Sequence, residues 1–340
     1  MIPRSSASWQ IATWQGELAQ AISSPADLLA ALELTPELLP AALGSAPDFP
    51  LRVPRGYVAR MRKGDARDPL LLQVLPLSQE QLTVPGFSYD AVGDLAAMTV
   101  PGLLHKYHGR VLLVTTGACA IHCRYCFRRH FPYSAANPGT QQWEAAIEYI
   151  GADSSIREVI LSGGDPLSLT NQRLSVLVER LEKIPHLKYL RIHTRMPIVL
   201  PKRIDDGLLN WLTGTRLKPI VVVHANHANE IDDHVRHALA LLAARGVSLL
   251  NQSVLLRGVN DSAQTLAELS ETLFDAGVLP YYLHSLDKVS GAAHFEVDEA
   301  SACQIMEQLR ASLAGYLVPR LVREQRGANS KLAIFSGMAN

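Results

Sequence analysis

The segment GACAIHCRYCFRRHFPY, residues 117–133, decides how the rest of this chain is interpreted. It places Cys119, Cys123 and Cys126 in a C-x3-C-x2-C spacing, and the sequence of 340 residues contains one further cysteine, Cys303. Three thiols this close together are not typical of core packing and indicate ligands for a soft metal centre. An iron–sulfur cluster is the leading interpretation, because cysteine thiolates hold such clusters.

The alternative is a structural zinc site in which His122 or His130 completes the set of three cysteines. Structural zinc sites usually combine two C-x2-C knuckles from separate segments, and the second knuckle is missing here. Three thiolates on a four-iron cluster would leave one iron open for a substrate or cofactor. The cluster is therefore favoured over zinc.

After residue 110 the sequence alternates between short β-branched runs and amphipathic helical runs. The predicted strands are 110–117, 157–164, 187–194, 219–226, 247–256 and 279–286, and the predicted helices are 140–150, 171–184, 203–212, 231–246 and 262–277. Strand–helix alternation of this kind predicts a parallel sheet. The expected fold is α/β, a partial (β/α)6 barrel that resembles a TIM barrel.

Each predicted strand ends in small or reactive polar residues. They include the cysteine segment, Gly163-Gly164-Asp165, His193-Thr194-Arg195, His224 to His227, Gln252-Ser253 and Asp287. In barrels, active sites form at the carboxyl ends of the strands. These groups are therefore expected to line one bowl.

Composition narrows the possible functions. Lys+Arg and Asp+Glu both number 32, and this zero net charge argues against a nucleic-acid binder that works through a broad basic field. No apolar run reaches the ~18 residues that cross a membrane, and the N-terminus lacks the apolar core of a signal peptide. A cytoplasmic protein is expected, in which clustered thiols favour metal binding or catalysis over disulfides.

The cysteine spacing, with the aromatic Tyr125 before the last cysteine and a strand before the first, resembles the radical S-adenosylmethionine superfamily. The resemblance implies a 4Fe-4S cluster whose open iron binds S-adenosylmethionine and a reaction that begins with a 5′-deoxyadenosyl radical. It also implies that Gly163, Gly164 and Asp165 contact the amino group of S-adenosylmethionine. Without the resemblance, these glycines would be interpreted as an ordinary turn after a strand.

Further motifs resemble the lysine 2,3-aminomutase family over about residues 50–335. They are CRYCFRRHF, LSGGDPL, IHTRMP, NHANE, NQSVLLRGVND and PYYLHSLD. This family adds pyridoxal 5′-phosphate, and the resemblance implies that Lys331, in RGANSKL, bonds to it. Arg110 would bind its phosphate, as a guanidinium fork suits phosphate oxygens. Gln252 is also assigned to cofactor binding. The family's glycine run before the lysine is reduced here to Gly327.

The same resemblance assigns the substrate contacts. Arg128 would hold the carboxylate of lysine, and Asp287 and Glu324 would bind its distal ammonium. The family typically has aspartate where this chain has Glu324, so the pocket geometry is expected to differ. Two carboxylates facing one ammonium would select lysine over shorter or neutral amino acids.

Three domains are expected. Residues 1–100 would form a mainly helical extension, in which Ser24 and Thr35 cap helices that begin with proline. Residues 101–290 would form the barrel, and residues 291–340 a C-terminal helix and the segment that carries the cofactor lysine.

The resemblance implies a lysine 2,3-aminomutase that converts (S)-α-lysine to (R)-β-lysine. The short C-terminus is most like members that supply β-lysine for modification of translation elongation factor P. Its expected partners are L-lysine, a flavodoxin-like or ferredoxin-like reductant protein, elongation factor P and its lysyl-transferring enzyme, with no nucleic acid and no membrane. The alternatives are a radical enzyme without pyridoxal phosphate that acts on a macromolecule and a zinc-stabilised binding module.

Overall fold

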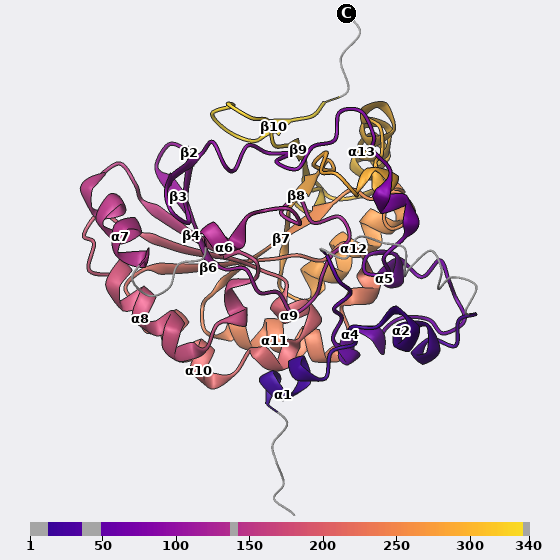
Figure 1. Ribbon diagram of the computed structural model, residues 1–340, viewed down its shortest axis with the longest axis horizontal. Helices are drawn as coiled ribbons and strands as arrows, with labels where there is room; N and C mark the ends of the chain where they lie inside the picture. The colour runs from indigo at the N-terminus through magenta and orange to yellow at the C-terminus, as the bar shows by residue number, and fades with distance from the viewer. Residues whose placement is uncertain (1–12, 36–48, 137–141, 336–340) are drawn as a thin grey trace, which may run out of the picture.

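A single open sheet of ten strands, in the order β1 to β10, organises the molecule (Figure 1). This computed structural model describes residues 13–35, 49–136 and 142–335. The strands are β1 (Met98–Val100), β2 (Leu103–Tyr107), β3 (Arg110–Thr116), β4 (Glu158–Gly163), β5 (Tyr189–Thr194), β6 (Lys218–Val223), β7 (Ser248–Val254), β8 (Leu279–His284), β9 (Arg320–Arg323) and β10 (Leu332–Ala333). No pairing joins β1 to β10 in the described part of the chain, so the barrel is partial, as predicted.

All six predicted strands are present as β3 to β8, and each pairs in parallel with the next. The sheet extends beyond them at both ends. An antiparallel pair, β1 and β2, precedes β3, while β9 adds a parallel strand to β8 and β10 returns antiparallel. The sheet thus includes strands from outside the predicted barrel, residues 101–290. β1 belongs to the predicted segment 1–100, and β9 and β10 belong to the predicted segment 291–340.

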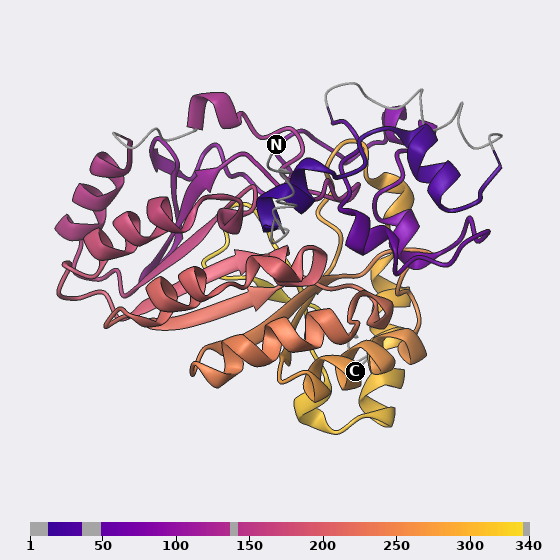
Figure 2. The same ribbon diagram turned by 90° about the horizontal axis from the view of Figure 1, so that it is seen from below.

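Helices connect the parallel strands and cover the outer face of the sheet (Figures 1 and 2). They are α7 (Gln142–Ala152), α8 (Asn171–Leu181), α10 (Asp206–Thr213), α11 (Asp233–Ala244), α12 (Ala263–Asp275) and α13 (Glu299–Ser312). The last five begin after a residue whose side chain accepts a hydrogen bond from a first-turn amide: Thr170, Asp205, Asp232, Ser262 and Asp298. Such caps satisfy amides that have no partner within the helix.

Shorter helical turns fill the loops at the carboxyl ends of the strands and elsewhere. They are α6 (Tyr133–Ala136), η3 (Pro166–Ser168), α9 (Met196–Val199), η4 (Pro201–Arg203), η5 (Ala228–Glu230), η6 (Ala293–Phe295) and η7 (Gly315–Leu317). No helix among the described residues is long and apolar enough to span a membrane.

The N-terminal part of the chain consists of short helices and loops on one side of the sheet (Figure 1). Its helices are α1 (Trp14–Ala19), α2 (Pro25–Ala31), α4 (Arg55–Val58), α5 (Pro69–Leu72) and η2 (Ser78–Gln81). Ser24 caps α2 and Pro25 opens it, as predicted. The helix predicted to start after Thr35 falls on residues 36–48, outside the described residues.

Main-chain hydrogen bonds connect this N-terminal part of the chain to the cysteine segment. The His122 amide donates to the Arg52 carbonyl (3.0 Å), and the Arg124 amide donates to the Gln73 carbonyl (2.9 Å). Nδ1 of His122 lies 2.8 Å from the Pro50 carbonyl. Main-chain contacts on both sides of Cys123 therefore fix the backbone of the segment before any metal binds.

A fully buried ion cluster joins the same two parts of the chain. Glu80 receives hydrogen bonds from the guanidinium groups of Arg124 (Nε, 2.8 Å) and Arg129 (Nη2, 2.6 Å), and its side chain and that of Arg124 are completely inaccessible. Burial alone would raise the pKa of Glu80, but hydrogen bonds and positive charge from both arginines lower it. The carboxylate is therefore ionised and compensates two buried cations.

Replacing Glu80 with alanine should strongly destabilise the protein, because Arg124 and Arg129 would stay buried without their carboxylate. Loss of one member of a buried ion pair typically costs about 3–5 kcal/mol. Urea unfolding followed by circular dichroism measures this difference. Glu144→Ala is the control, since it removes an exposed carboxylate that pairs with Arg180 at the surface, and it should change stability little. Equal effects of the two variants would contradict the structural role of Glu80.

Candidate active site

A cavity of about 330 Å³ opens at the carboxyl ends of the parallel strands. Every residue predicted for the site lines this cavity: Arg110, Cys119, Cys123, Cys126, Arg128, Gly163, Gly164, Asp165, Gln252, Asp287, Glu324 and Lys331. Of the strand-end groups expected in the bowl, Asn226, His227 and Ser253 do not line the cavity, so the predicted bowl is confirmed only in part. The positions span more than two hundred residues of sequence, and the strand order brings them together.

The three cysteines follow β3 and face the cavity from one loop. Burial raises the pKa of Cys119 well above its usual value and that of Cys126 to about 11, and neighbouring thiolates add to both shifts. The raised pKa values favour the protonated thiols of Cys119 and Cys126 in the absence of metal, so cluster assembly must release protons from these two residues. Three thiols on one loop fit a cluster that takes one ligand per iron.

A single metal ion fits the loop less well than a cluster does. Among the described residues, no three Cys, His, Asp or Glu side chains gather closely enough to hold one ion. The side chains thus do not form the four-ligand zinc site considered from the sequence.

The glycines after β4 are required by close backbone packing. A Cβ on Gly164 would lie 2.4 Å from the Ala118 carbonyl oxygen, and one on Gly163 would lie 2.7 Å from the Thr116 oxygen. Gly163 also has φ of +119°, which side-chain-bearing residues rarely adopt. This turn therefore packs against the start of the cysteine segment, a sufficient reason for both glycines; contact with S-adenosylmethionine stays a prediction.

Asp165 binds protein groups with both of its carboxylate oxygens. Oδ1 accepts from the Thr194 hydroxyl (2.7 Å) and the Leu167 amide (3.0 Å), and Oδ2 accepts from the Arg195 amide (2.7 Å). Burial raises its pKa, although these hydrogen bonds oppose the shift. Asp165 thus ties the end of β4 to the end of β5, and the structure brings it to the cavity wall without a free oxygen.

A chain of alternating charges crosses the cavity wall. Lys331 Nζ lies 2.6 Å from Glu324 Oε2, and Glu324 Oε1 lies 2.9 Å from Lys106 Nζ. Lys106 also pairs with Asp94 (2.6 Å), whose other oxygen pairs with Nε of Arg128 (2.7 Å). The chain therefore connects the predicted cofactor lysine with the predicted substrate arginine through two residues, Lys106 and Asp94, that the sequence did not mark.

The two predicted ammonium-binding carboxylates have opposite pKa shifts. Burial alone would raise the pKa of Glu324, but the ammonium groups of Lys331 and Lys106 lower it to about 2. Burial and the charge of Glu324 raise the pKa of Asp287 to about 7. Asp287 makes no side-chain hydrogen bond or ion pair with any described residue. It is the carboxylate that lacks a cation.

Two other predicted cofactor residues also have unoccupied polar groups. The guanidinium of Arg110 stacks over the Tyr107 ring, 4.9 Å from its centroid, and forms no ion pair or hydrogen bond within the described chain. The Gln252 side-chain amide on β7 likewise lines the cavity and makes no hydrogen bond with the described residues. An unpaired arginine fits the phosphate of pyridoxal phosphate, since phosphate would satisfy its donors.

Several lining residues were missed or left without a role by sequence reasoning. Asp94 and Lys106 precede the first recognised strand, where no motif marks them. Arg195 follows β5 and contacts Cys123, while His193 on β5 has a buried Nε2 without a described partner. The strand-end pattern indicated the last two as polar groups of the bowl, but their contacts depend on pairing between distant strands.

Comparison with known proteins now identifies the family. The model of the Radical SAM superfamily matches residues 113–270. The chain is 51% identical to the L-lysine 2,3-aminomutase of Escherichia coli (strain K12) over 94% of this chain and 93% of that protein. The chain belongs to the L-lysine 2,3-aminomutase family of radical S-adenosylmethionine enzymes.

Other members of the family differ in similarity and length. The L-lysine 2,3-aminomutase of Haemophilus influenzae is 49% identical over 94% of each chain. That of Clostridium subterminale is 34% identical over 97% of this chain and 79% of its own length. The chain thus resembles the relatives that it covers nearly completely more than it resembles the longer one.

Membership makes this aminomutase-family chain a radical S-adenosylmethionine enzyme of the isomerase class, and it overturns the alternative of a zinc-stabilised binding module. The family implies a 4Fe-4S cluster, S-adenosylmethionine and pyridoxal phosphate. The donors around the cavity fit these groups: three thiols on one loop, an unpaired arginine and a lysine that faces the same space.

Replacing Asp287 with asparagine should stabilise the protein at pH 8 and change stability little at pH 4. A carboxyl pKa of about 7 in the fold, against about 3.9 in the unfolded chain, means that folding favours the protonated form. The wild-type penalty is therefore absent below pH 4, grows up to pH 7 and then stays constant. Because cavity water screens this partly exposed group, we expect a gain of about 1–3 kcal/mol at pH 8.

Urea unfolding of the metal-free protein at both pH values measures this effect. Asp261→Asn, which changes an exposed carboxylate in a loop, is the matched control and should show little difference at either pH. A stabilisation by Asp287→Asn that is equal at pH 4 and pH 8 would show that the carboxyl does not ionise as described.

Proposed function

We propose that this chain converts L-lysine to β-lysine as a lysine 2,3-aminomutase that uses pyridoxal phosphate. The observation that carries the proposal is the unpaired Asp287 carboxylate, which shares one cavity with three cysteines and Lys331. An unpaired carboxylate in the wall of a half-buried cavity favours a cationic ligand, because a cation would compensate its charge. The printed names of relatives at 49–51% identity support L-lysine as the substrate.

The proposed contacts orient lysine between two charged ends of the cavity. Arg128 Nη2 makes no hydrogen bond with the described residues, so this edge of its guanidinium is available to the substrate carboxylate. Asp287 would accept hydrogen bonds from the distal ammonium. A shorter or neutral amino acid would leave the Asp287 charge unpaired, which supports selection for lysine.

Glu324 has a different role in this proposal from the one expected at first. Its two oxygens already bind Lys331 and Lys106. It can therefore assist a substrate ammonium only after one of these cations has lost its charge. Before that, Glu324 holds the Lys331 side chain in place through their ion pair, and Asp287 is the first contact for the substrate.

Lys331 and Arg110 are the residues proposed to hold pyridoxal phosphate. When bound, this cofactor supplies conjugation that stabilises an unpaired electron during migration of the amino group. The chain's own residues bind, orient and exclude water. Arg110 would anchor the phosphate, while Gln252, Gly163, Gly164 and Asp165 would line the space for S-adenosylmethionine and the cofactor ring.

The physiological setting is proposed on the same resemblance. The product would be (R)-β-lysine, supplied to the lysyl-transferring enzyme of translation elongation factor P in the cytoplasm, with a flavodoxin-like or ferredoxin-like protein as electron donor. The higher identity to relatives of similar length than to the longer clostridial enzyme supports this assignment.

Anaerobic incubation of the reconstituted protein with L-lysine, S-adenosylmethionine, pyridoxal phosphate and dithionite should yield β-lysine, detected by chiral chromatography. Cys123→Ala should abolish both the cluster absorbance and the product, because it removes a proposed iron ligand. Cys303→Ala is the matched control and should retain both, since Cys303 lies on α13 away from the loop. A protein with an intact cluster that makes no β-lysine would refute the proposal.

Pyridoxal phosphate bound to the protein should show visible absorbance that disappears in Lys331→Ala. The reason is that a covalent bond to Lys331 creates this absorbance, and no other predicted site residue is a lysine. Lys288→Ala is the control: it removes an exposed lysine that pairs with Glu296 and should leave the spectrum unchanged. If the wild-type protein binds no pyridoxal phosphate, the alternative of a radical enzyme that acts on a macromolecule without this cofactor is favoured.

A further inference from the structure

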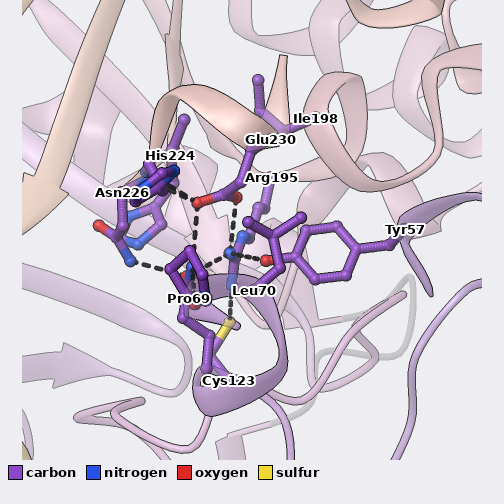
Figure 3. Close-up of polar contacts among 12 residues, drawn as sticks. Tyr57, Pro69, Leu70, Cys123, Arg195, Ile198, His224, Asn226 and Glu230 are labelled. Atoms are coloured by element: carbon purple, nitrogen blue, oxygen red, sulfur yellow. Dashed lines mark hydrogen bonds and ion pairs between the residues drawn. The ribbon is translucent and has the colours of Figure 1, made fainter. Parts of the chain in front are cut away.

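Arg195 places its guanidinium directly against one of the three cysteines. It follows β5 and precedes α9, and its Nη1 donates to the Cys123 sulfur at 2.8 Å (Figure 3). The side chain is only 6% exposed. A buried cation therefore lies within hydrogen-bond distance of an expected cluster ligand, and the catalytic roles assigned above do not use it.

The position of Arg195 is fixed on its other side by three acceptors. Its Nη2 donates to the Gln73 side-chain oxygen (2.7 Å), to Glu230 Oε2 (2.8 Å) and to the Tyr57 hydroxyl (3.1 Å) (Figure 3). Because Nη2 is engaged in this way, Nη1 is held toward Cys123. The donor is therefore oriented before a cluster is bound.

Glu230 provides the negative charge that compensates Arg195. Arg195 lies between this carboxylate and the Cys123 sulfur. Burial alone would raise its pKa, but the positive charge and hydrogen bond of Arg195 lower it. Its Oε1 accepts from the Asn226 amide (2.8 Å) and the Gln73 side-chain nitrogen (3.2 Å), so the carboxylate is saturated with donors. The ion pair thus presents its positive end to Cys123.

We propose that Arg195 is a positioning residue that raises the reduction potential of the cluster through its hydrogen bond to Cys123, and that Glu230 limits this effect. Reduction adds negative charge to the cluster and its sulfur ligands. A charged donor stabilises the reduced form more than the oxidised form, and hydrogen bonds to sulfur are a known determinant of cluster potentials. The inference rests on the cluster implied by the family and does not depend on the substrate.

The proposal also gives the N-terminal part of the chain a function. Tyr57 belongs to α4 and Gln73 follows α5, and both supply acceptors for Arg195. Gln73 in addition accepts the Arg124 amide through its carbonyl. This part of the chain therefore acts on the cluster through Arg195, in addition to supporting the cysteine backbone.

Two variants with opposite expected shifts test the proposal. Arg195→Gln removes the cation, so its cluster should be harder to reduce, with about a tenfold lower ratio of reduced to oxidised protein at a fixed potential, equivalent to ~59 mV for one electron. Glu230→Gln leaves Arg195 without its compensating charge, so the cluster should be easier to reduce. The measurement is a dithionite titration of the reconstituted full-length protein, followed by electron paramagnetic resonance without S-adenosylmethionine or lysine.

Arg203→Gln is the matched control. Arg203 is also a completely buried arginine, but it donates to the Leu167 and Leu169 carbonyls and does not contact a cysteine. Its variant should keep the wild-type potential. An unchanged potential in Arg195→Gln with a full iron content would overturn the proposal, as would shifts of the same sign in both test variants. If both lose the cluster while Arg203→Gln keeps it, the ion pair holds the loop and does not tune it, which also overturns the proposal.

Discussion

The ion cluster of Glu80 with Arg124 and Arg129 is the constraint on which the arrangement of the site depends. Arg124 and Arg129 flank Cys126 in sequence, and Glu80 belongs to the N-terminal part of the chain. Because buried charges must remain paired, neither part can separate from the other without exposing them. The cysteine loop is thus held by the protein before the cluster forms, and the space around its thiols is defined in advance.

Much of the fold was predictable because its signals are local. β-Branched runs, from which β3 to β8 were predicted, and helix caps such as Ser24, with proline at the helix start, each act within a few residues. β1, β2, β9 and β10 were missed because such short strands are stable only through pairing with neighbours. The C-terminal hairpin, for example, depends on β8, about forty residues earlier in the sequence.

The site was predictable as a set of residue types but not as a set of contacts. The cysteine spacing and the resemblance to the family placed all the predicted residues on one cavity. They did not indicate that Glu324 is already paired with two lysines, or that Gly163 and Gly164 are needed for backbone packing. The pairing of Glu324 depends on the position of Lys106, and the need for the two glycines depends on the path of residues 116–118. No pattern in a single sequence indicates either of these positions.

The alternating charges from Lys331 to Arg128 have a consequence for how ligands at the two ends of the cavity affect each other's affinity. Each charged group in this chain forms an ion pair with the next one. A change of charge at one end therefore alters the strength of the ion pairs at the other end. If Lys331 is neutralised, Lys106 is the only cation left to pair with Glu324. The ion pair of Lys106 with Asp94 then becomes weaker, and the ion pair of Asp94 with Arg128 becomes stronger. Binding of one ligand at Lys331 and of another at Arg128 would therefore be thermodynamically linked, and the linkage must be equal in both directions.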